Sequence, residues 1–283
     1  MNHKLFFCAF ALLLLITAGA CSCSGESGSG KGDVEIATDS ISDTGSFKKS
    51  NGEVCQMKVN LVVSYPQAYK DSVTLDKLRK LFAAHLLRAP KDIKSIKDAM
   101  QFYAKSIISR NTPSQYGQQA SASDTVNGDI DEIDIDKFES TINIKVVYND
   151  NELITFCKEE AIDKNGQRTS TSHHYTSFDL KEMKKISLAD LIREDSYDKV
   201  TALLKSKLMD DKGASNEDEL NDMGYFNLPN LAVTNNFFFT SKGVTWSYDS
   251  SVIAVASVGE PTINIDYDDL EQYYSDNSVL KRL

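Results

Sequence analysis

The chain has 283 residues and a formal charge of −10, with 31 Lys and Arg against 41 Asp and Glu. This length predicts one large domain or two small ones, and a hydrophobic content of 41% is enough to build a core. The acidic balance argues against binding to nucleic acid, whose phosphates need a basic surface, and against attraction to anionic lipid. Composition also excludes a collagen, a disulfide-dense miniprotein and a protein that crosses a membrane many times.

The amino terminus has the pattern of an export signal. A short cationic start precedes an unbroken apolar run over residues 5–16, and small residues then lead up to Cys21. The run is too short to span a bilayer, which takes about 20 apolar residues. Because Cys21 directly follows Ala18-Gly19-Ala20, this site is similar to a bacterial lipobox. We therefore predict a lipoprotein signal peptide over residues 1–20 and lipidation of Cys21; an ordinary cleaved signal and lipidation of Cys23 are the alternatives.

The segment that follows predicts a flexible tether. Residues 21–50 are rich in Ser, Gly, Asp and Thr and have little apolar content, which is typical of coil-like linkers. A lipid, a tether and a globular body together predict an exported protein. We expect it to be anchored by its lipid to a bacterial membrane, at the outer membrane or the cell surface.

The body predicts an α+β fold of two consecutive subdomains, each a mostly antiparallel sheet packed with a few helices. In the first, residues 51–180, a strand-like run ends at Ser64-Tyr65-Pro66 and two segments with helical spacing follow. Turn signals at Asn149-Asp150-Asn151 and Asn165-Gly166 then separate three strands. The predicted elements are a strand at 54–63, helices at 75–86 and 93–107, and strands at 140–148, 153–161 and 169–180.

The second subdomain, residues 181–283, predicts short helices and a compact set of strands. Ser187 and Asp190 have capping-box spacing, which predicts the start of a short helix. A three-residue loop at Ser241-Lys242-Gly243 predicts a hairpin with Gly in a left-handed conformation. The predicted elements are helices at 188–193, 197–208 and 269–274, hairpin strands at 237–240 and 244–248, and a half-buried strand at 262–267.

Three segments of the body resemble a known family. The first is Ser64-Tyr65-Pro66 before a Leu-rich helix, and the second runs from Ser177-Phe178-Asp179-Leu180 to Lys185-Ile186-Ser187-Leu188. The third is the aromatic hairpin from Asn236 to Tyr248 with its continuation to Leu270. Together they resemble the RsiV-like family, which takes in the extracellular part of the anti-sigma factor RsiV and the amino-terminal region of the peptidoglycan deacetylase PdaC.

The resemblance implies a deacetylase-associated unit followed by an RsiV-type carboxy-terminal unit. It also implies lysozyme as a partner, because the RsiV ectodomain binds lysozyme. Family members carry a Pro-Tyr-Glu loop after the aromatic hairpin, where this chain has Ser250-Ser251-Val252, and a Gly-Gly-Ala-His segment where this chain has residues 170–175. A Pro-Tyr loop presents a rigid aromatic anchor, so we do not carry lysozyme binding over to this chain.

The sequence contains no complete catalytic motif. His85 lies on the apolar side of a predicted helix, where a core histidine is the simpler interpretation. His173 and His174 are consecutive in a predicted strand, so they point to opposite faces and do not bind one metal ion together. We therefore expect no catalytic residues, no metal site and no cofactor.

Two further features leave alternatives open. Cys55 and Cys157 both fall in predicted strands, and either a disulfide or two separate buried thiols fits an oxidising compartment. The run Asp129–Asp136 alternates acids with Ile, which favours a strand with one solvated face. A weak surface calcium site is the alternative, although the run lacks the turn glycine of an EF-hand.

Two functions from different classes remain, beside a structural envelope lipoprotein without a specific ligand, which the sequence does not separate from the first. We favour a non-enzymatic binding or sensing lipoprotein whose ligand is a component of the cell envelope, either peptidoglycan or another glycan or a protein. The alternative is an accessory factor or hydrolase that acts on envelope glycan; a cleft with two carboxylates would favour it. Candidate ligand contacts lie on and after the aromatic hairpin, although buried aromatics are as a rule plain core. These candidates are Trp246, Tyr248, Ser250 and Ser251.

Overall fold

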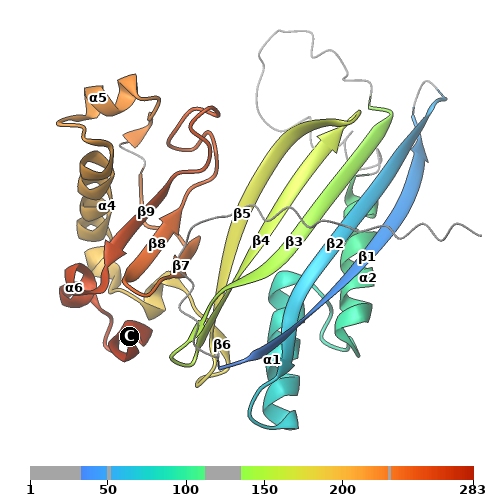
Figure 1. Ribbon diagram of the computed structural model, residues 1–283, viewed down its shortest axis with the longest axis horizontal. Helices are drawn as coiled ribbons and strands as arrows, with labels where there is room; N and C mark the ends of the chain where they lie inside the picture. The colour runs from blue at the N-terminus through green and yellow to red at the C-terminus, as the bar shows by residue number, and fades with distance from the viewer. Residues whose placement is uncertain (1–32, 50–51, 112–134, 229–230) are drawn as a thin grey trace, which may run out of the picture. The chain divides into compact units, whose positions relative to one another are not determined.

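The computed structural model describes residues 33–49, 52–111, 135–228 and 231–283. They form a mixed α+β fold with one six-stranded and one three-stranded sheet (Figure 1), which confirms the predicted fold class. Both sheets belong to one compact unit that spans Gly32–Leu283. The predicted export signal, Cys21 and most of the acidic run before residue 135 lie outside the described residues.

The six-stranded sheet and two helices make up the first subdomain. Its elements are β1 (Glu35–Lys48), β2 (Val54–Ala68), α1 (Ser72–Leu86), α2 (Ile96–Arg110), β3 (Lys137–Asp150), β4 (Leu153–Lys164), β5 (Gln167–Asp179) and β6 (Lys184–Lys185). The strands lie side by side in chain order. Because the two helices connect β2 to β3, these strands are parallel, whereas the other neighbouring pairs are antiparallel. The sheet continues to Lys185, slightly beyond the boundary predicted at residue 180.

Strand β1 corrects the prediction that residues 21–50 are a tether. Its whole length pairs with β2, from Glu35 opposite Ala68 to Lys48 opposite Val54. Sheet pairing uses backbone groups, and β1 lies at the edge of the sheet, so polar side chains are tolerated along its solvent face. Polar cross-strand pairs add to this pairing, as between the hydroxyls of Thr38 and Ser64, which are 3.0 Å apart.

Strand β2 also runs further than predicted, through Pro66 to Ala68. Its pairing with β3 ends at Val63, opposite Ile144, so beyond that point β2 has a neighbour on one side only. A proline lacks a backbone N–H, but it fits in a strand where no partner needs that donor. Pro66 therefore does not end the strand.

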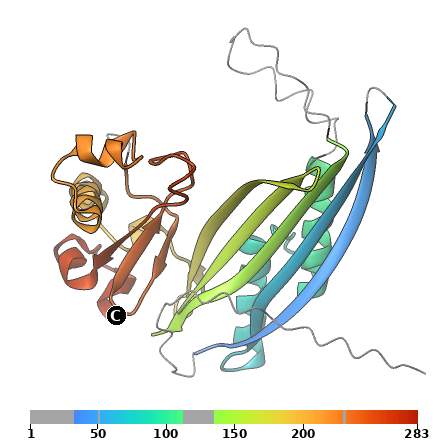
Figure 2. The same ribbon diagram turned by 45° about the horizontal axis from the view of Figure 1, so that its top comes forward.

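Helices α1 and α2 cover one face of the six-stranded sheet (Figures 1 and 2). The Asp71 side chain caps α1 by accepting from the backbone N–H groups of Val73 and Thr74, and Ser95 caps α2 by accepting from that of Asp98. From Cys55 to Val63, every second residue of β2 is buried, and Val59, Leu61 and Val63 of this row pack in the core under the helices. The fully buried residues of this core include Val59, Leu61, Val63, Leu78, Phe82, Met100, Ile142, Ile144, Phe156 and Phe178.

The second subdomain contains the three-stranded sheet. Its elements are α4 (Tyr197–Lys212), α5 (Glu217–Asp222), β7 (Phe237–Phe239), β8 (Gly243–Ser247), β9 (Thr262–Asp266) and α6 (Tyr267–Leu270), with 3-10 turns at Leu188–Asp190, Glu194–Ser196, Glu271–Tyr273 and Val279–Arg282. The predicted helix at 188–193 is a single 3-10 turn, which the predicted capping box between Ser187 and Asp190 opens. Helix α5 was not predicted.

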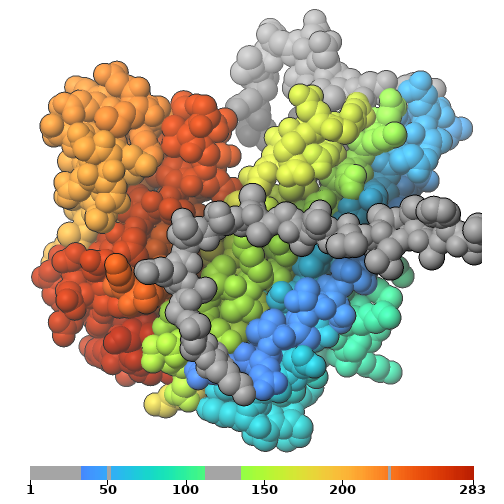
Figure 3. All heavy atoms as spheres, in the orientation of Figure 1, coloured from blue at the N-terminus to red at the C-terminus, as the bar shows by residue number. Residues whose placement is uncertain are grey.

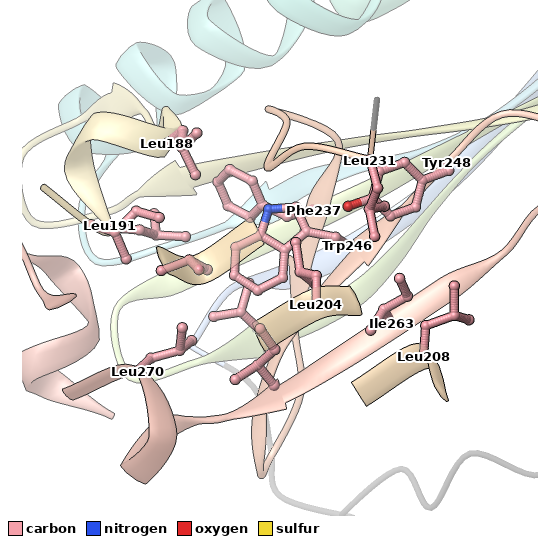
Figure 4. Packing of buried hydrophobic residues seen from close by; sticks show 14 of the residues in the cluster. Leu188, Leu191, Leu204, Leu208, Leu231, Phe237, Trp246, Tyr248, Ile263 and Leu270 are labelled. Carbon is pink, nitrogen blue, oxygen red and sulfur yellow. The ribbon is translucent and has the colours of Figure 1, made fainter. Parts of the chain in front are cut away.

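Trp246 lies at the centre of the second core. Its ring is fully buried beside Phe237, Leu204 and Ile263 (Figure 4), and the ring centroids of Trp246 and Phe237 are 6.4 Å apart. All five residues of β8 are buried, so this strand is covered on both of its faces. The indole N–H of Trp246 has no hydrogen-bond partner within the described residues.

Gly243 is needed for a different reason from the one predicted. It is absent from the residues with positive φ, so it does not supply a left-handed turn. A Cβ atom at this position would lie 2.0 Å from the backbone oxygen of Ile265 on the neighbouring strand. Gly243 therefore permits a close approach of two backbones at the start of β8.

Candidate functional site in the cleft between the two sheets

Aromatic side chains of β7 join the second subdomain to the first. The ring of Phe238 stacks on that of Tyr175 from β5, with centroids 4.4 Å apart. The ring of Phe239 packs against that of Tyr148 from β3 at 5.7 Å. These contacts all lie on the face of the six-stranded sheet that the helices leave open. They form one wall of the region where the two sheets meet.

Asn236 fixes the register between β5 and β8. Its amide nitrogen donates to the backbone oxygens of His173 and Ser247, each at 3.1 Å, and its amide oxygen accepts from the backbone N–H of Tyr175 at 2.8 Å. One side chain thus satisfies backbone groups of both subdomains. Buried polar groups are costly when unpaired, so these three bonds favour a single arrangement of the two strands.

A cleft of about 560 Å³ opens beside this joint. Figure 3 shows the surface of this region, where the yellow residues of β5 lie beside the orange to red residues of the second subdomain. Most of the lining side chains carry hydroxyl groups, which both donate and accept hydrogen bonds. The lining residues are Thr169, Ser170, Thr171, His173, Tyr175, Ser247, Ser250, Ala256, Gly259, Glu260 and Thr262.

His173 and Glu260 form an ion pair or hydrogen bond across the cleft. Nδ1 of His173 lies 2.7 Å from Oε2 of Glu260, and Nε2 of His173 lies 3.8 Å from a carboxylate oxygen of Glu159 on β4. The Glu260 side chain is 14% exposed, and its second oxygen, Oε1, is buried with no partner within the described residues. Such an oxygen favours a ligand or a water molecule that donates a hydrogen bond.

The neighbouring His174 points away from this cleft, as the alternation of strand side chains predicts. It is exposed on the helix side of the sheet, opposite Lys158 on β4.

His85 is more exposed than predicted. Its ring packs on Phe178 at the edge of the first core, and partial burial lowers the pKa of His85 below its usual value.

Trp246 and Tyr248 were candidate ligand contacts, and that prediction is wrong. Trp246 is 0% exposed and Tyr248 is 4% exposed, because the second core encloses both rings. The hydroxyl of Tyr248 donates to the backbone oxygen of Ala232 at 3.0 Å. Of the other two candidates, Ser250 lines the cleft, whereas Ser251 is exposed outside it.

Cys55 and Cys157 are both buried free thiols, which decides between the two alternatives that the sequence leaves open. Cys157 pairs with Lys145 of β3, whereas Gln56, next to Cys55, pairs with Lys137 at the other end of that strand. At about 3.3 Å per residue, this separation along the sheet far exceeds the ~6 Å that a disulfide allows between Cα atoms. Burial raises the pKa of the Cys157 thiol to about 11.

The described residues contain no group of three or more His, Cys, Asp or Glu side chains placed to hold a metal ion. Within the same ranges, no helix has the length and apolar content needed to cross a membrane.

Comparison with known proteins finds a matching domain within the second subdomain. Residues 189–268 match the family described as "Protein of unknown function (DUF3298)", so the chain contains a DUF3298 domain. A solved structure of a DUF3298 family member from Bacteroides fragilis is 21% identical, with a TM-score of 0.64, over 89% of this chain and 98% of that one. A DUF3298 family protein from Pseudomonas aeruginosa is 16% identical, with a TM-score of 0.50, over 87% and 97% of the two chains. The search of curated proteins gives no match.

These similarities show a shared fold and extend well beyond residues 189–268. At this level of identity they carry no information about a ligand or a reaction. The cleft was not predicted from the sequence. His173 and Glu260 are separated by 87 residues along the chain, and no local spacing relates them.

Proposed function

We propose that this protein is a membrane-anchored envelope lipoprotein that binds a polar segment of a cell-envelope glycan in the cleft between its two sheets. The RsiV-like assignment and the lipid on Cys21 are parts of the same proposal. The protein acts by binding and has no catalytic role. Lysozyme is not included as a ligand, because the loop at Ser250-Ser251-Val252 lacks the Pro-Tyr anchor of the family.

The observation that carries this proposal is the chemistry of the cleft. Its lining combines hydroxyl groups with one buried, unpaired carboxylate oxygen of Glu260. Sugar rings and N-acetyl groups present many hydroxyl and amide donors, which match both kinds of acceptor. An apolar ligand would leave these polar groups unpaired, and that would cost about 1–3 kcal/mol for each buried group.

A second candidate is hydrolysis of envelope glycan, and one observation favours it. Carboxylates of Glu260 and Glu159 lie on either side of the His173 ring, at 2.7 and 3.8 Å from its two nitrogens. A histidine oriented by a carboxylate is a common general base. Hydrolysis breaks a glycosidic bond and releases sugar fragments, whereas binding leaves the glycan intact. Analysis of the products therefore distinguishes the two candidates.

Calorimetry with soluble peptidoglycan fragments tests the binding proposal. The protein for this experiment begins at Gly32, so that it contains strand β1. A start at residue 51, where the sequence predicted the first subdomain to begin, would remove that strand. We expect saturable binding, and at least about tenfold weaker binding for Glu260→Gln, since a hydrogen bond to a charged group contributes about 1.5–3 kcal/mol. His173→Gln is expected to weaken binding as well.

His174→Gln is the matched control, because it makes the same chemical change one residue away on the opposite face of β5. Equal losses in His173→Gln and His174→Gln would contradict the cleft as the binding site, and so would the absence of binding. Release of soluble reducing sugars from intact peptidoglycan, abolished in Glu260→Gln, would replace the first candidate by the second. Lysozyme binding that Glu260→Gln leaves unchanged would instead favour an RsiV-type role.

A further inference from the structure

The helical layer of the first subdomain is basic, although the chain as a whole is acidic. Residues 72–110, which contain α1 and α2, hold nine Lys or Arg and three Asp, whereas the whole chain has a formal charge of −10. The remaining residues are therefore even more acidic than the total indicates. Such a separation of charge means that the whole-chain charge does not describe the field at this surface.

Most of these cations are exposed and have no partner. The side chains of Lys77, Arg88, Lys91, Lys94, Lys97 and Lys105 are exposed, and within the described residues none has a hydrogen bond or ion pair. We call these six residues the basic patch. By contrast, Lys80 is paired with Asp76 at 2.7 Å, and Arg79 donates to the backbone oxygen of Pro66.

The patch residues belong to one side of the sheet. Both helices cover the same sheet face (Figures 1 and 2), and buried side chains such as Leu78, Phe82 and Met100 point inward to that face. Lys94, just before α2, and Lys97 of α2 line a hollow of about 310 Å³ with Arg79 and Lys80 of α1, and four cations there face the two carboxylates of Asp39 and Asp76. The patch lies on the opposite side of the sheet from the glycan cleft.

One exposed aromatic residue accompanies the cations. Phe102 of α2 is 41% exposed, and it lies one helical turn from Lys105. Aromatic side chains beside lysines are typical of surfaces that rest at the level of lipid headgroups.

We propose that the basic patch docks the protein on the surface of an anionic phospholipid bilayer. Charge complementarity is the basis of this inference: six exposed cations without partners match a surface of lipid phosphates, and each basic residue near such a surface adds about 1 kcal/mol. The inference goes beyond the proposed function, since it depends neither on the cleft nor on the lipid at Cys21. It differs from the expectation, based on total charge, that the protein is not attracted to anionic lipid.

Sedimentation with lipid vesicles tests this inference. The segment Gly32–Leu283, which contains both hydrophobic cores, is mixed with vesicles of phosphatidylcholine alone or with about one third phosphatidylglycerol. We expect binding only to the anionic vesicles, and loss of that binding at about 0.5 M salt because screening shortens the range of the attraction. Lys91→Gln, Lys94→Gln and Lys97→Gln combined are expected to weaken binding by roughly a hundredfold, about fivefold for each lysine.

The matched control combines Lys181→Gln, Lys199→Gln and Lys242→Gln. It removes the same charge from exposed lysines outside the helical layer, and we expect less than a threefold change. Equal loss in the two triple variants, equal binding to neutral vesicles, or no vesicle binding would overturn the proposal. Binding to a soluble polyanion without binding to vesicles would also overturn it, and would assign the patch to an anionic polymer. The cleft variants Glu260→Gln and His173→Gln are expected to bind vesicles normally, so failure of one proposal is distinguishable from failure of the other.

Discussion

The two sheets of this molecule are covered in different ways. Strand β2 of the large sheet alternates buried and exposed residues, because helices cover one of its faces. All five residues of β8 in the small sheet are buried, because α4 and the second core lie on one side and the large sheet contributes to the other. Leu153 of β4 is a member of the second core, although it belongs to the first subdomain.

This difference indicates that the dependence of the two subdomains on each other is mostly one-sided. The first subdomain contains both the sheet and the helices that bury its apolar face. The second subdomain needs Tyr148, Leu153 and Tyr175 of the first to cover its phenylalanines. The large sheet is thus the scaffold, and the small sheet is completed by packing on it.

Separating the subdomains is expected to have the largest effect. Residues 186–283 alone would expose Phe238 and Phe239, and large exposed apolar patches favour aggregation. We expect this segment to show no cooperative thermal transition, whereas residues 33–185 alone unfold cooperatively. Circular dichroism during heating measures both. A sharp transition of the isolated second subdomain would contradict the one-sided dependence.

Trp246→Ala is expected to destabilise the whole protein by about 3–5 kcal/mol, since it removes the largest fully buried side chain and leaves a cavity. Phe102→Ala is the control, because it removes a ring that is 41% exposed, and it should change stability by less than about 0.5 kcal/mol. Chemical unfolding followed by fluorescence or circular dichroism gives both values. Similar losses for the two variants would mean that Trp246 is not at the centre of the core.

Arg282→Ala is expected to cost about 3 kcal/mol. Arg282, near the end of the chain, donates at 2.8 Å to Asp179 of β5, which is 2% exposed, so the variant leaves a buried carboxylate without its cation. Backbone N–H groups of Lys181 and Glu182 still bind that carboxylate, which limits the loss. Lys281→Ala removes an adjacent exposed cation and should have little effect in the same unfolding measurement.

The smallest expected effect concerns the buried thiol of Cys157. Burial raises its pKa to about 11, from 9.0, so between these values the unfolded chain releases a proton that the folded chain retains. Stability is therefore complete below pH 9 and falls as the pH rises towards 11. At pH 10 the free energy of unfolding is about 1 kcal/mol lower than below pH 9. Cys157→Ser should abolish this fall, because the variant has no thiol to titrate.

The same cysteines offer a direct check on the absence of a disulfide. Without reductant, we expect mass spectrometry to find no alkylation of Cys55 or Cys157 at pH 8 in the folded protein, because both thiols are buried. Alkylation of both after unfolding, again without reductant, is the expected result. A mass that indicates a Cys55–Cys157 disulfide would contradict the register of β2, β3 and β4.

Periodicity in the sequence predicted the elements that bury a clear apolar face. The alternation along 54–63 and the helical spacing of Leu75 to Leu86 both correspond to observed elements, because burial on one side leaves a pattern in the chain. Strand β1 and helix α5 were missed because neither buries a continuous apolar face, so neither leaves such a pattern. Half of the residues of β1 are Ser, Thr or Asp, and backbone pairing holds the strand, whereas α5 buries only Leu220.

The candidate site was less predictable than the fold. His173 was recognised as facing away from His174, but its partner Glu260 comes from a loop of the other subdomain. Trp246 and Tyr248 were expected as contacts because they are aromatic, yet the second core encloses both rings. A site formed where two subdomains meet depends on how they pack together. Local patterns in this sequence do not predict that packing.

Strand β1 also limits how far the protein can reach. The described chain is held in place from Asp33, whose carboxylate accepts from the backbone N–H of Glu152 at 2.7 Å. If Cys21 carries a lipid as proposed, the twelve residues from Cys21 to Asp33 extend at most about 40 Å, whereas the expected tether to residue 50 would reach about 100 Å. The cleft between the two sheets would then sample only the layer next to the bilayer, so a ligand deeper in the envelope would have to come to it.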